Sequence, residues 1–213
     1  ASLDHIDRLI PHRAGESLEI DVATRRSLEL TRAMRDGSRD GSLLSVIDRT
    51  VTPMGSRLLC DWLANPLTDV ATINARLDAV GELVQAETER EQIQSALKGI
   101  YDLERLVARV TTGRASPRDL RCVGTTLQCL PETKALLESR QSELLRELHD
   151  RLDLCPELCE RLDDALVPDC PMVGREGGYI RTGYHAELDR LKELAAGGKQ
   201  WIAQYKAGES ERT

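Results

Sequence analysis

The chain has 213 residues, of which 40% are hydrophobic and 31% are charged, and its formal net charge is −7 at pH 7. This composition is typical of a soluble globular protein, and no apolar run approaches the roughly 18 residues that a membrane span requires. A DNA-binding domain usually displays a basic patch, because phosphate contacts dominate its affinity; the basic residues here are dispersed, so most of the chain is not expected to grip DNA directly.

Residues 1–17 are expected to be the end of an element that belongs to a preceding domain. Their apolar residues share one helical face: Leu3, Ile6, Leu9 and Ile10. Pro11 ends the pattern, because a proline inside a helix removes a hydrogen bond and clashes with the preceding turn. Further on, residues 35–41 (RDGSRDG) predict a polar loop rich in turns.

Residues 42–84 predict three amphipathic helices with clear start and stop signals. Thr52 can cap the second helix, whose first position suits Pro53. Asn65 precedes a proline and therefore ends that helix, because such a residue is disfavoured in the α region. Thr68 or Asp69 caps the third. The predicted core residues of this region are Leu58, Leu59, Trp62, Leu63, Leu77 and Val80.

Residues 89–170 predict further helices whose leucines face inward. Ser116 and Asp119 flank Pro117 and can form a capping box, in which each side chain accepts from the other residue's backbone N–H. We expect Pro131 to interrupt the helix that begins there. Cys155-Pro156 then predicts a further short helix.

A long helix is expected from about Gly183 to Ala207, after a glycine turn in which Gly177 or Gly178 takes a positive φ. Apolar residues recur along it at the spacing of a coiled-coil seam: Tyr184, Leu188, Leu191, Ile202 and Tyr205. Such a helix would extend roughly 35–40 Å. Gly197-Gly198 predicts a kink or a close helix approach within it.

The elements together predict an all-α fold: an irregular multi-helix core bundle with a long projecting helix. The near absence of aromatic residues, with no phenylalanine at all, agrees with a core built mainly from leucine.

No catalytic, cofactor-binding or metal-binding residues are predicted. Cys155 and Cys159 form one loose pair, whereas structural zinc sites usually have two closer pairs, so the six cysteines are interpreted as thiols in a reducing cytoplasm. No secretory signal opens the chain. No P-loop occurs, because Tyr184 stands where the motif after Gly178 and Gly183 requires lysine.

Three stretches in the same order carry a family resemblance. The first is Asp48-x-Thr50-x-Thr52-x-Met54-Gly55-x-Arg57-Leu58-Leu59-x-x-Trp62-Leu63-x-x-Pro66-Leu67, followed by Arg76-Leu77-Asp78-Ala79-Val80. The second is Asp102-Leu103-Glu104-Arg105-Leu106, followed by Gly113-Arg114-Ala115-Ser116-Pro117-Arg118-Asp119-Leu120. The third is Gly177-Gly178-Tyr179-Ile180-Arg181-x-Gly183-Tyr184-x-Ala186-Glu187-Leu188-Asp189-x-Leu191. Together they resemble the core, or lever, domain of the MutS family of DNA mismatch-repair proteins.

The resemblance implies three parts: 1–17 as the tail of a connector domain, 18–177 as the helical core, and 178–213 as a lever helix leading toward a clamp domain. It implies a mechanical role, in which the segment transmits conformational change between an ATPase and a DNA-binding clamp. The parent protein would be a homodimer that binds mismatched duplex DNA through its clamp and mismatch domains. Other domains of the same polypeptide would be the segment's partners.

Full family members also carry a mismatch-recognition domain with a Phe-x-Glu wedge and an ATPase with a Walker motif. Neither motif occurs in this chain, so it is expected to be a non-enzymatic segment, with ATP and Mg²⁺ bound only in the ATPase domain of a DNA-dependent parent ATPase. The alternative is a stand-alone helical scaffold that binds partner helices and has no DNA or ATP role.

Overall fold

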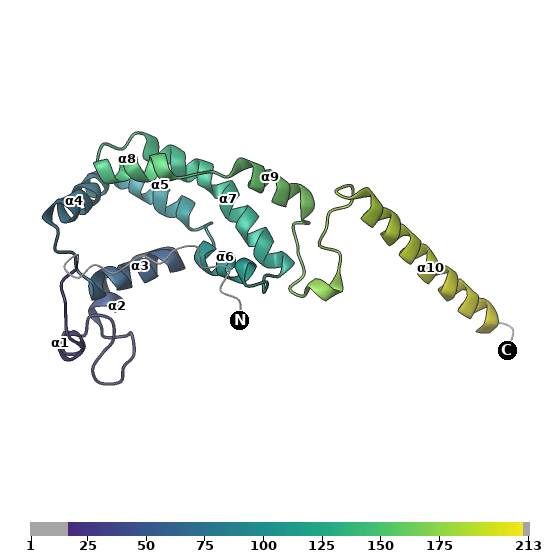
Figure 1. Cartoon of the computed structure of the whole chain (residues 1–213), viewed down its shortest axis with the longest axis horizontal. Helices are drawn as coiled ribbons and strands as arrows, with labels where there is room; N and C mark the ends of the chain where they lie inside the picture. The colour runs from purple at the N-terminus through teal and green to yellow at the C-terminus, as the bar shows by residue number, and fades with distance from the viewer. Residues whose placement is uncertain (1–16, 211–213) are drawn as a thin grey trace.

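The computed structural model describes residues 17–210, with side chains described for residues 17–175 and 177–198. Within this part of the chain the fold is all-α, as predicted (Figure 1). The α-helices are α1 (Val22–Ser27), α2 (Leu43–Ile47), α3 (Pro53–Ala64), α4 (Val70–Gln85), α5 (Glu87–Leu97), α6 (Leu103–Thr111), α7 (Pro117–Glu138), α8 (Glu143–Arg151), α9 (Pro156–Ala165) and α10 (Ala186–Ser210). Helices α1–α9 are called the body below.

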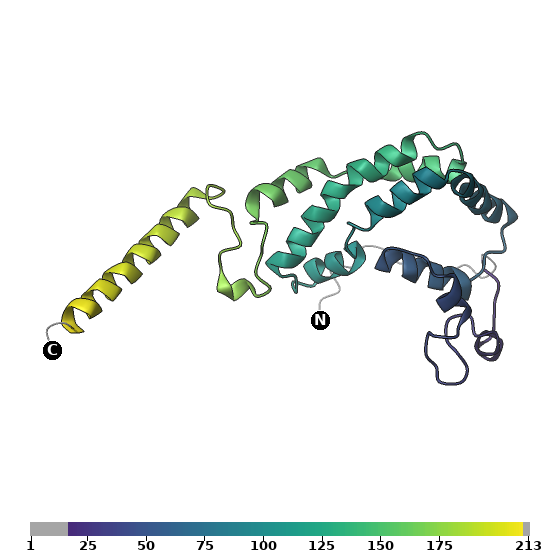
Figure 2. The ribbon, with the colours of Figure 1, turned by 180° about the vertical axis from the view of Figure 1, so that it is seen from behind.

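Helix α7 is the centre of the body. Helices α5, α6, α8 and α9 all pack against it, and the view from behind shows them gathered along its length (Figure 2). Buried residues of the body include Leu106 of α6, Leu127 and Leu130 of α7, and Leu145 of α8. Helix α9 approaches especially closely, because a Cβ atom added at Gly124 of α7 would lie 3.3 Å from the Cβ atom of Leu162.

The local start and stop signals operate as the sequence predicts. The Thr52 side chain accepts a hydrogen bond from the backbone N–H of Gly55 at the start of α3. Asp69 caps α4 by accepting from Thr72. The capping box is present at α7, and both glycines of the predicted turn, at positions 177 and 178, have positive φ.

Pro131 does not interrupt its helix, and this prediction is wrong. Helix α7 continues through it to Glu138. Pro131 itself is exposed, and its missing N–H removes only the helical hydrogen bond to the carbonyl of Leu127. Packing of α7 against four other helices then outweighs the local cost.

Four of the six predicted core residues are exposed, which corrects the prediction for them. The exposed fractions are 51% for Leu58, 37% for Trp62, 60% for Leu77 and 56% for Val80. Leu59 and Leu63 are half-buried. The reason is that α3 packs chiefly on the short α2, and α4 on α5 and α8, so within the described residues no helix fully covers these apolar stripes.

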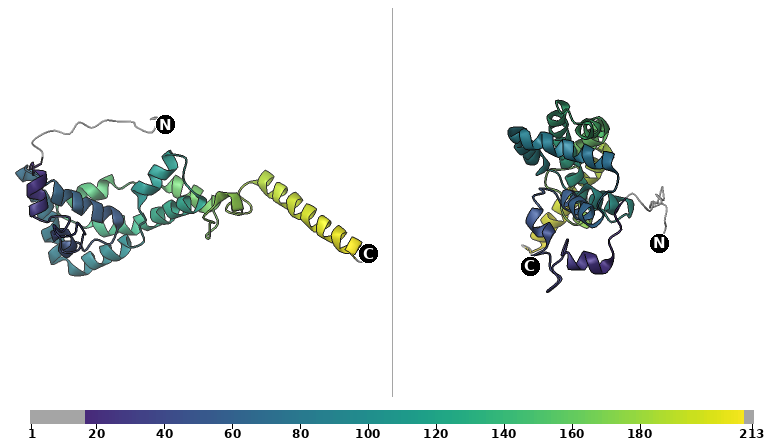
Figure 3. Two further views of the ribbon diagram at one scale, coloured as in Figure 1. Left: turned by 90° about the horizontal axis from the view of Figure 1, so that it is seen from below. Right: turned by 90° about the vertical axis from the view of Figure 1, so that its left-hand side faces the viewer.

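Helix α10 projects away from the body, as the views from the front and from below show (Figures 1 and 3). It begins three residues later than predicted, at Ala186, and extends to Ser210. Of the predicted seam, Tyr184 and Leu191 are exposed and Leu188 is half-buried. The side chains of Ile202 and Tyr205, like residues 1–16 of the predicted connector tail, lie outside the described part.

A candidate mechanical site at the base of helix α10

The chain that leaves α9 and the chain that enters α10 are held together by backbone pairing. The N–H of Val167 donates to the carbonyl of Tyr179 at 3.0 Å, and the N–H of Arg181 donates to that of Ala165 at 2.8 Å. Leu166 and Ile180 form an antiparallel bridge between these bonds. Leu166 is only 4% exposed, so this pairing, which we call the base of α10, is anchored in the body.

Arg181 strengthens the base by binding the end of α9. Its guanidinium donates to the carbonyls of Asp163 at 2.7 Å and Leu166 at 3.2 Å. Carbonyls at a helix C-terminus lack partners within the helix and carry partial negative charge, so a cation is well placed there. The side chain at position 181 therefore ties the entry of α10 to the exit of α9.

The same turn of α9 is held to α7 by a second arginine. Arg121 of α7 donates to the Asp163 carboxylate at 2.7 Å, and Gln128 donates to it at 3.2 Å. The hydrogen bond from Arg121 is the main reason that the pKa of Asp163 lies below its ordinary value. A continuous path of polar contacts thus leads from α7 through α9 to Arg181.

The first two turns of α10 also contact the base. The Asp189 carboxylate accepts from the N–H of Gly183 at 2.7 Å, and the ammonium of Lys192 donates to the carbonyl of Ile180 at 3.0 Å. Gly183 has φ +92°, a conformation that favours glycine. These contacts set the direction in which the helix leaves the body.

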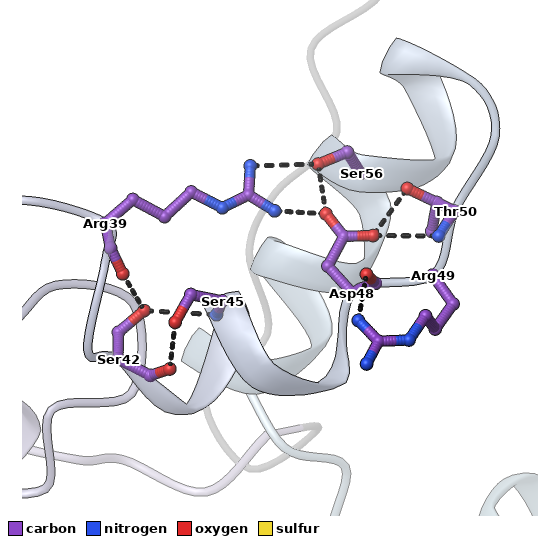
Figure 4. A network of polar contacts seen from close by, with 7 residues as sticks. All are labelled: Arg39, Ser42, Ser45, Asp48, Arg49, Thr50 and Ser56. Atoms are coloured by element: carbon purple, nitrogen blue, oxygen red, sulfur yellow. Dashed lines mark hydrogen bonds and ion pairs between the residues drawn. The ribbon is translucent and has the colours of Figure 1, made fainter.

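Within the body, the first motif stretch builds a polar corner between α2 and α3 (Figure 4). Asp48 accepts from the backbone N–H and the hydroxyl of Thr50 at 2.9 and 2.6 Å and from the Ser56 hydroxyl at 2.7 Å, and it pairs with Arg39. These contacts, that with the Thr50 hydroxyl first, hold the pKa of Asp48 well below its usual range. A Cβ at Gly55 would lie 3.0 Å from the Thr52 hydroxyl oxygen, so a side chain there would push against the residue that caps α3.

The first and second motif stretches meet through Arg57 of α3. Its two terminal nitrogens donate to the two carboxylate oxygens of Asp102 at 2.6 and 2.7 Å, and the guanidinium also pairs with Glu104. Asp102 is the residue that caps α6, accepting from the N–H of Arg105. One arginine therefore fixes the position of α6 relative to α3.

A comparable contact joins α4 to α8, and sequence reasoning missed it. The Glu82 carboxylate accepts from the backbone N–H groups of Gln141 and Ser142, at 2.9 and 2.7 Å, at the N-terminus of α8. Its charge suits the positive end of that helix. The two groups are about 60 residues apart, so no local pattern indicated the contact. Arg181 lies in a motif stretch, but no local pattern indicated its contacts with α9.

The side chains that the structure describes form no evident catalytic or metal-binding arrangement. They include no group of three or more His, Cys, Asp or Glu residues placed to hold a metal ion. Among the described residues, no helix is both long and apolar enough to cross a bilayer. The features that stand out are contacts that join helices.

The comparisons with known proteins agree with the motif stretches. The model of the family described as MutS domain III matches residues 23–207. The chain is 53% identical over 212 residues to the DNA mismatch repair protein MutS of Rhodopirellula baltica, and 45% identical over 213 residues to that of Symbiobacterium thermophilum. Each alignment covers 100% of this chain and 24% of the relative, so the chain spans about a quarter of the length of these relatives. The chain therefore belongs to the MutS domain III family.

Proposed function

We propose that the chain is the mechanical core of a MutS-like mismatch-repair protein, with α10 as its lever. The observation that supports this most directly is the arrangement at the base, where a helix of 25 residues leaves the body through one short paired segment. At 1.5 Å per residue its length is about 38 Å. A rotation of 10° at the base would move its tip by about 7 Å, by the same geometry.

A lever is useful only if the body that carries it is stiff. The Arg57–Asp102 pair and the contact of Glu82 with Ser142 join helices that are far apart in sequence, and α7 packs against four helices. Strain applied to α3 or α4 would therefore be passed to α7 and α9 as a rigid-body movement. The polar contacts of Arg121, Asp163 and Arg181 would transmit this movement to α10.

The remaining functions belong to other domains of the parent protein in this proposal. The parent would be a cytoplasmic homodimer that recognises mispaired or unpaired bases, with its ATP and Mg²⁺ held in a separate ATPase domain. The clamp at the far end of α10 would contact DNA. The match of the whole chain to mismatch-repair proteins favours this proposal over a stand-alone helical scaffold.

A domain exchange tests the proposal. This chain would replace the matching quarter of the Rhodopirellula baltica protein, and we expect the hybrid to retain mismatch repair in a strain that lacks its own mismatch-repair protein. In the hybrid, Arg181→Ala should leave mismatch binding intact but lower the stimulation of ATP turnover by a mismatch roughly threefold or more, since residues that couple two sites contribute about 0.5–2 kcal/mol.

Arg175→Ala is the matched control, because Arg175 lies in the same connection but its side chain makes no hydrogen bond or ion pair with the described residues. It should leave the stimulation unchanged. Equal stimulation in the Arg181→Ala and Arg175→Ala hybrids would refute the coupling role of the base. A hybrid that folds and binds mismatched DNA but never repairs would refute the assignment of the chain.

A further inference from the structure

Two adjoining pockets open where the loop after α1 meets the body. Their volumes are about 310 and 400 Å³, and Thr31, Arg32 and Gly37 line both of them. Sites for small molecules usually have volumes of roughly 300–1,000 Å³, so the two pockets together can hold a small molecule. They lie beside α1, at the end of the body opposite α10 (Figures 1 and 3).

The walls of both pockets contain arginines and no carboxylate. Arg25, Arg26 and Arg32 line the first pocket, and Arg39 and Arg57 join Arg32 in the second. The whole chain has a formal net charge of −7, so a wall whose only charged side chains are cations is a local exception. Such a concave surface attracts anions.

Two of the five arginines are already neutralised by the protein. Arg39 pairs with Asp48, as the close view of the polar corner shows (Figure 4). Arg57 pairs with Asp102 and Glu104. Any charge available to a ligand must therefore come from the other three.

The remaining three arginines have no counter-charge. Arg25 and Arg26 make no hydrogen bond or ion pair with the described residues. Arg32 donates only to the carbonyl of Gly37, at 3.2 Å. The Nε atom of Arg25 is shielded from water and has no hydrogen-bond partner. Buried donors are rarely left unpaired, so this one points to an acceptor that binds beside it.

The carboxylates nearest in sequence do not supply that acceptor. Asp21 caps α1 by accepting from the backbone N–H and the hydroxyl of Thr24, at 2.9 and 2.6 Å. Glu29 accepts from the N–H of Met34 at 2.5 Å. Neither of them, nor Asp36, lines the pockets. The unpaired cations therefore face a space that an external anion can enter.

We propose that these pockets bind a small molecule through a phosphate monoester group. A guanidinium presents paired N–H donors that match phosphate oxygens, and a phosphate monoester has a charge of about −1.5 to −2 at pH 7. Such a group offsets three unpaired cations better than the single charge of a carboxylate does. The apolar parts of the walls, which include Val22, Met34 and Leu44, would contact the organic part of the ligand.

Isothermal titration calorimetry of the full chain tests the proposal, with inorganic phosphate and adenosine monophosphate as probes at pH 7.5 and constant ionic strength. Both should bind at one site, the nucleotide more tightly. Arg25→Gln, Arg26→Gln and Arg32→Gln should each raise the Kd of the nucleotide about tenfold or more, because hydrogen bonds to charged groups are strong. The matched control is Arg35→Gln, in the same loop, whose side chain is 92% exposed and lines neither pocket; it should leave the Kd unchanged.

Circular dichroism should show the same helix content in all four variants. The Nε–Hε NMR signals of the wild type provide a measurement that does not depend on variants: those of Arg25 and Arg32 should shift when phosphate is added, and that of Arg35 should not. Absence of binding, or equal binding by the pocket variants and Arg35→Gln, would overturn the proposal.

Three further results would also count against it. Acetate that binds as tightly as phosphate would assign the pockets to a carboxylate instead. Duplex DNA that displaces adenosine monophosphate would assign them to a nucleic-acid backbone. Equal affinities for inorganic phosphate and the nucleotide would refute the role of the apolar walls.

Discussion

The guanidinium of Arg57 and the carboxylate of Asp102 form a two-point contact, with hydrogen bonds of 2.6 and 2.7 Å across 45 residues of sequence. Paired parallel hydrogen bonds of this kind fix orientation as well as distance. Since Asp102 also caps α6, the contact joins a helix start to a neighbouring helix face. This relationship converts two separate motif stretches into one rigid unit.

Arg57→Ala should therefore lower the urea midpoint of unfolding more than Arg105→Ala does. Arg105 contacts the same Asp102 carboxylate, but only at 3.4 Å and from a side chain that is 76% exposed, so it is a matched control. Asp102→Ala should cost about 0.5–2 kcal/mol from the lost cap alone. Equal midpoints for the two arginine variants would show that the Arg57 contact contributes nothing beyond a surface ion pair.

Asp48 should make stability depend on pH in the acid range. Its pKa in the folded protein lies below the ordinary value of 3.8, chiefly because of the Thr50 hydroxyl. The unfolded chain therefore binds a proton more readily, so the contribution of Asp48 is complete above that ordinary value and is lost as the pH falls below it. The difference in unfolding free energy between the wild type and Asp48→Asn should shrink from pH 5 to pH 3. A difference that stays constant over this range would contradict the role of the network.

Core truncations should separate the true core from the exposed stripes. Leu127 of α7 is 6% exposed, whereas Leu58 of α3 is 51% exposed. Leu127→Ala should cost roughly 2–5 kcal/mol of unfolding free energy, because it removes buried methyl groups and leaves a cavity. Leu58→Ala should cost less than about 1 kcal/mol by the same reasoning. Chemical denaturation of both variants checks this, and similar losses would place Leu58 in the core after all.

The close approach of α7 and α9 predicts that Gly124 tolerates no large side chain. Gly124→Leu should destabilise the body by about 1–3 kcal/mol, because the new side chain meets Leu162. Gly81 of α4 is a matched helical glycine with no atom within 4 Å of its added Cβ. Gly81→Leu should be neutral or stabilising, since leucine favours the helix more than glycine does. Thermal unfolding of both variants compares them, and a neutral Gly124→Leu would show that the two helices can separate freely.

Local features could be predicted from the sequence because their causes lie within a few residues. The caps at Thr52, Asp69 and Ser116 each join a side chain to an N–H three positions later. Pro131 shows the limit of this reasoning, because the helix around it is held by packing that no local rule describes. The projecting helix was predictable from its seam, although not the pairing that anchors it.

Contacts between distant residues could not be predicted in this way. Arg57 with Asp102 and Glu82 with Ser142 depend on how helices pack, and the sequence around each residue shows only a solvated charge. Apolar stripes have a related ambiguity. The residues Leu58 and Val80 do lie on apolar helix faces, but such a face indicates only that something covers it, and not which element does so.

Small-angle X-ray scattering of the purified chain tests the central claim most directly. A compact protein of this length would have a radius of gyration of about 17 Å. A body with α10 projecting about 38 Å from its base should instead give a value above about 20 Å and a long tail in the distribution of interatomic distances. A radius near 17 Å without that tail would mean that α10 folds back on the body, and the lever account would be contradicted.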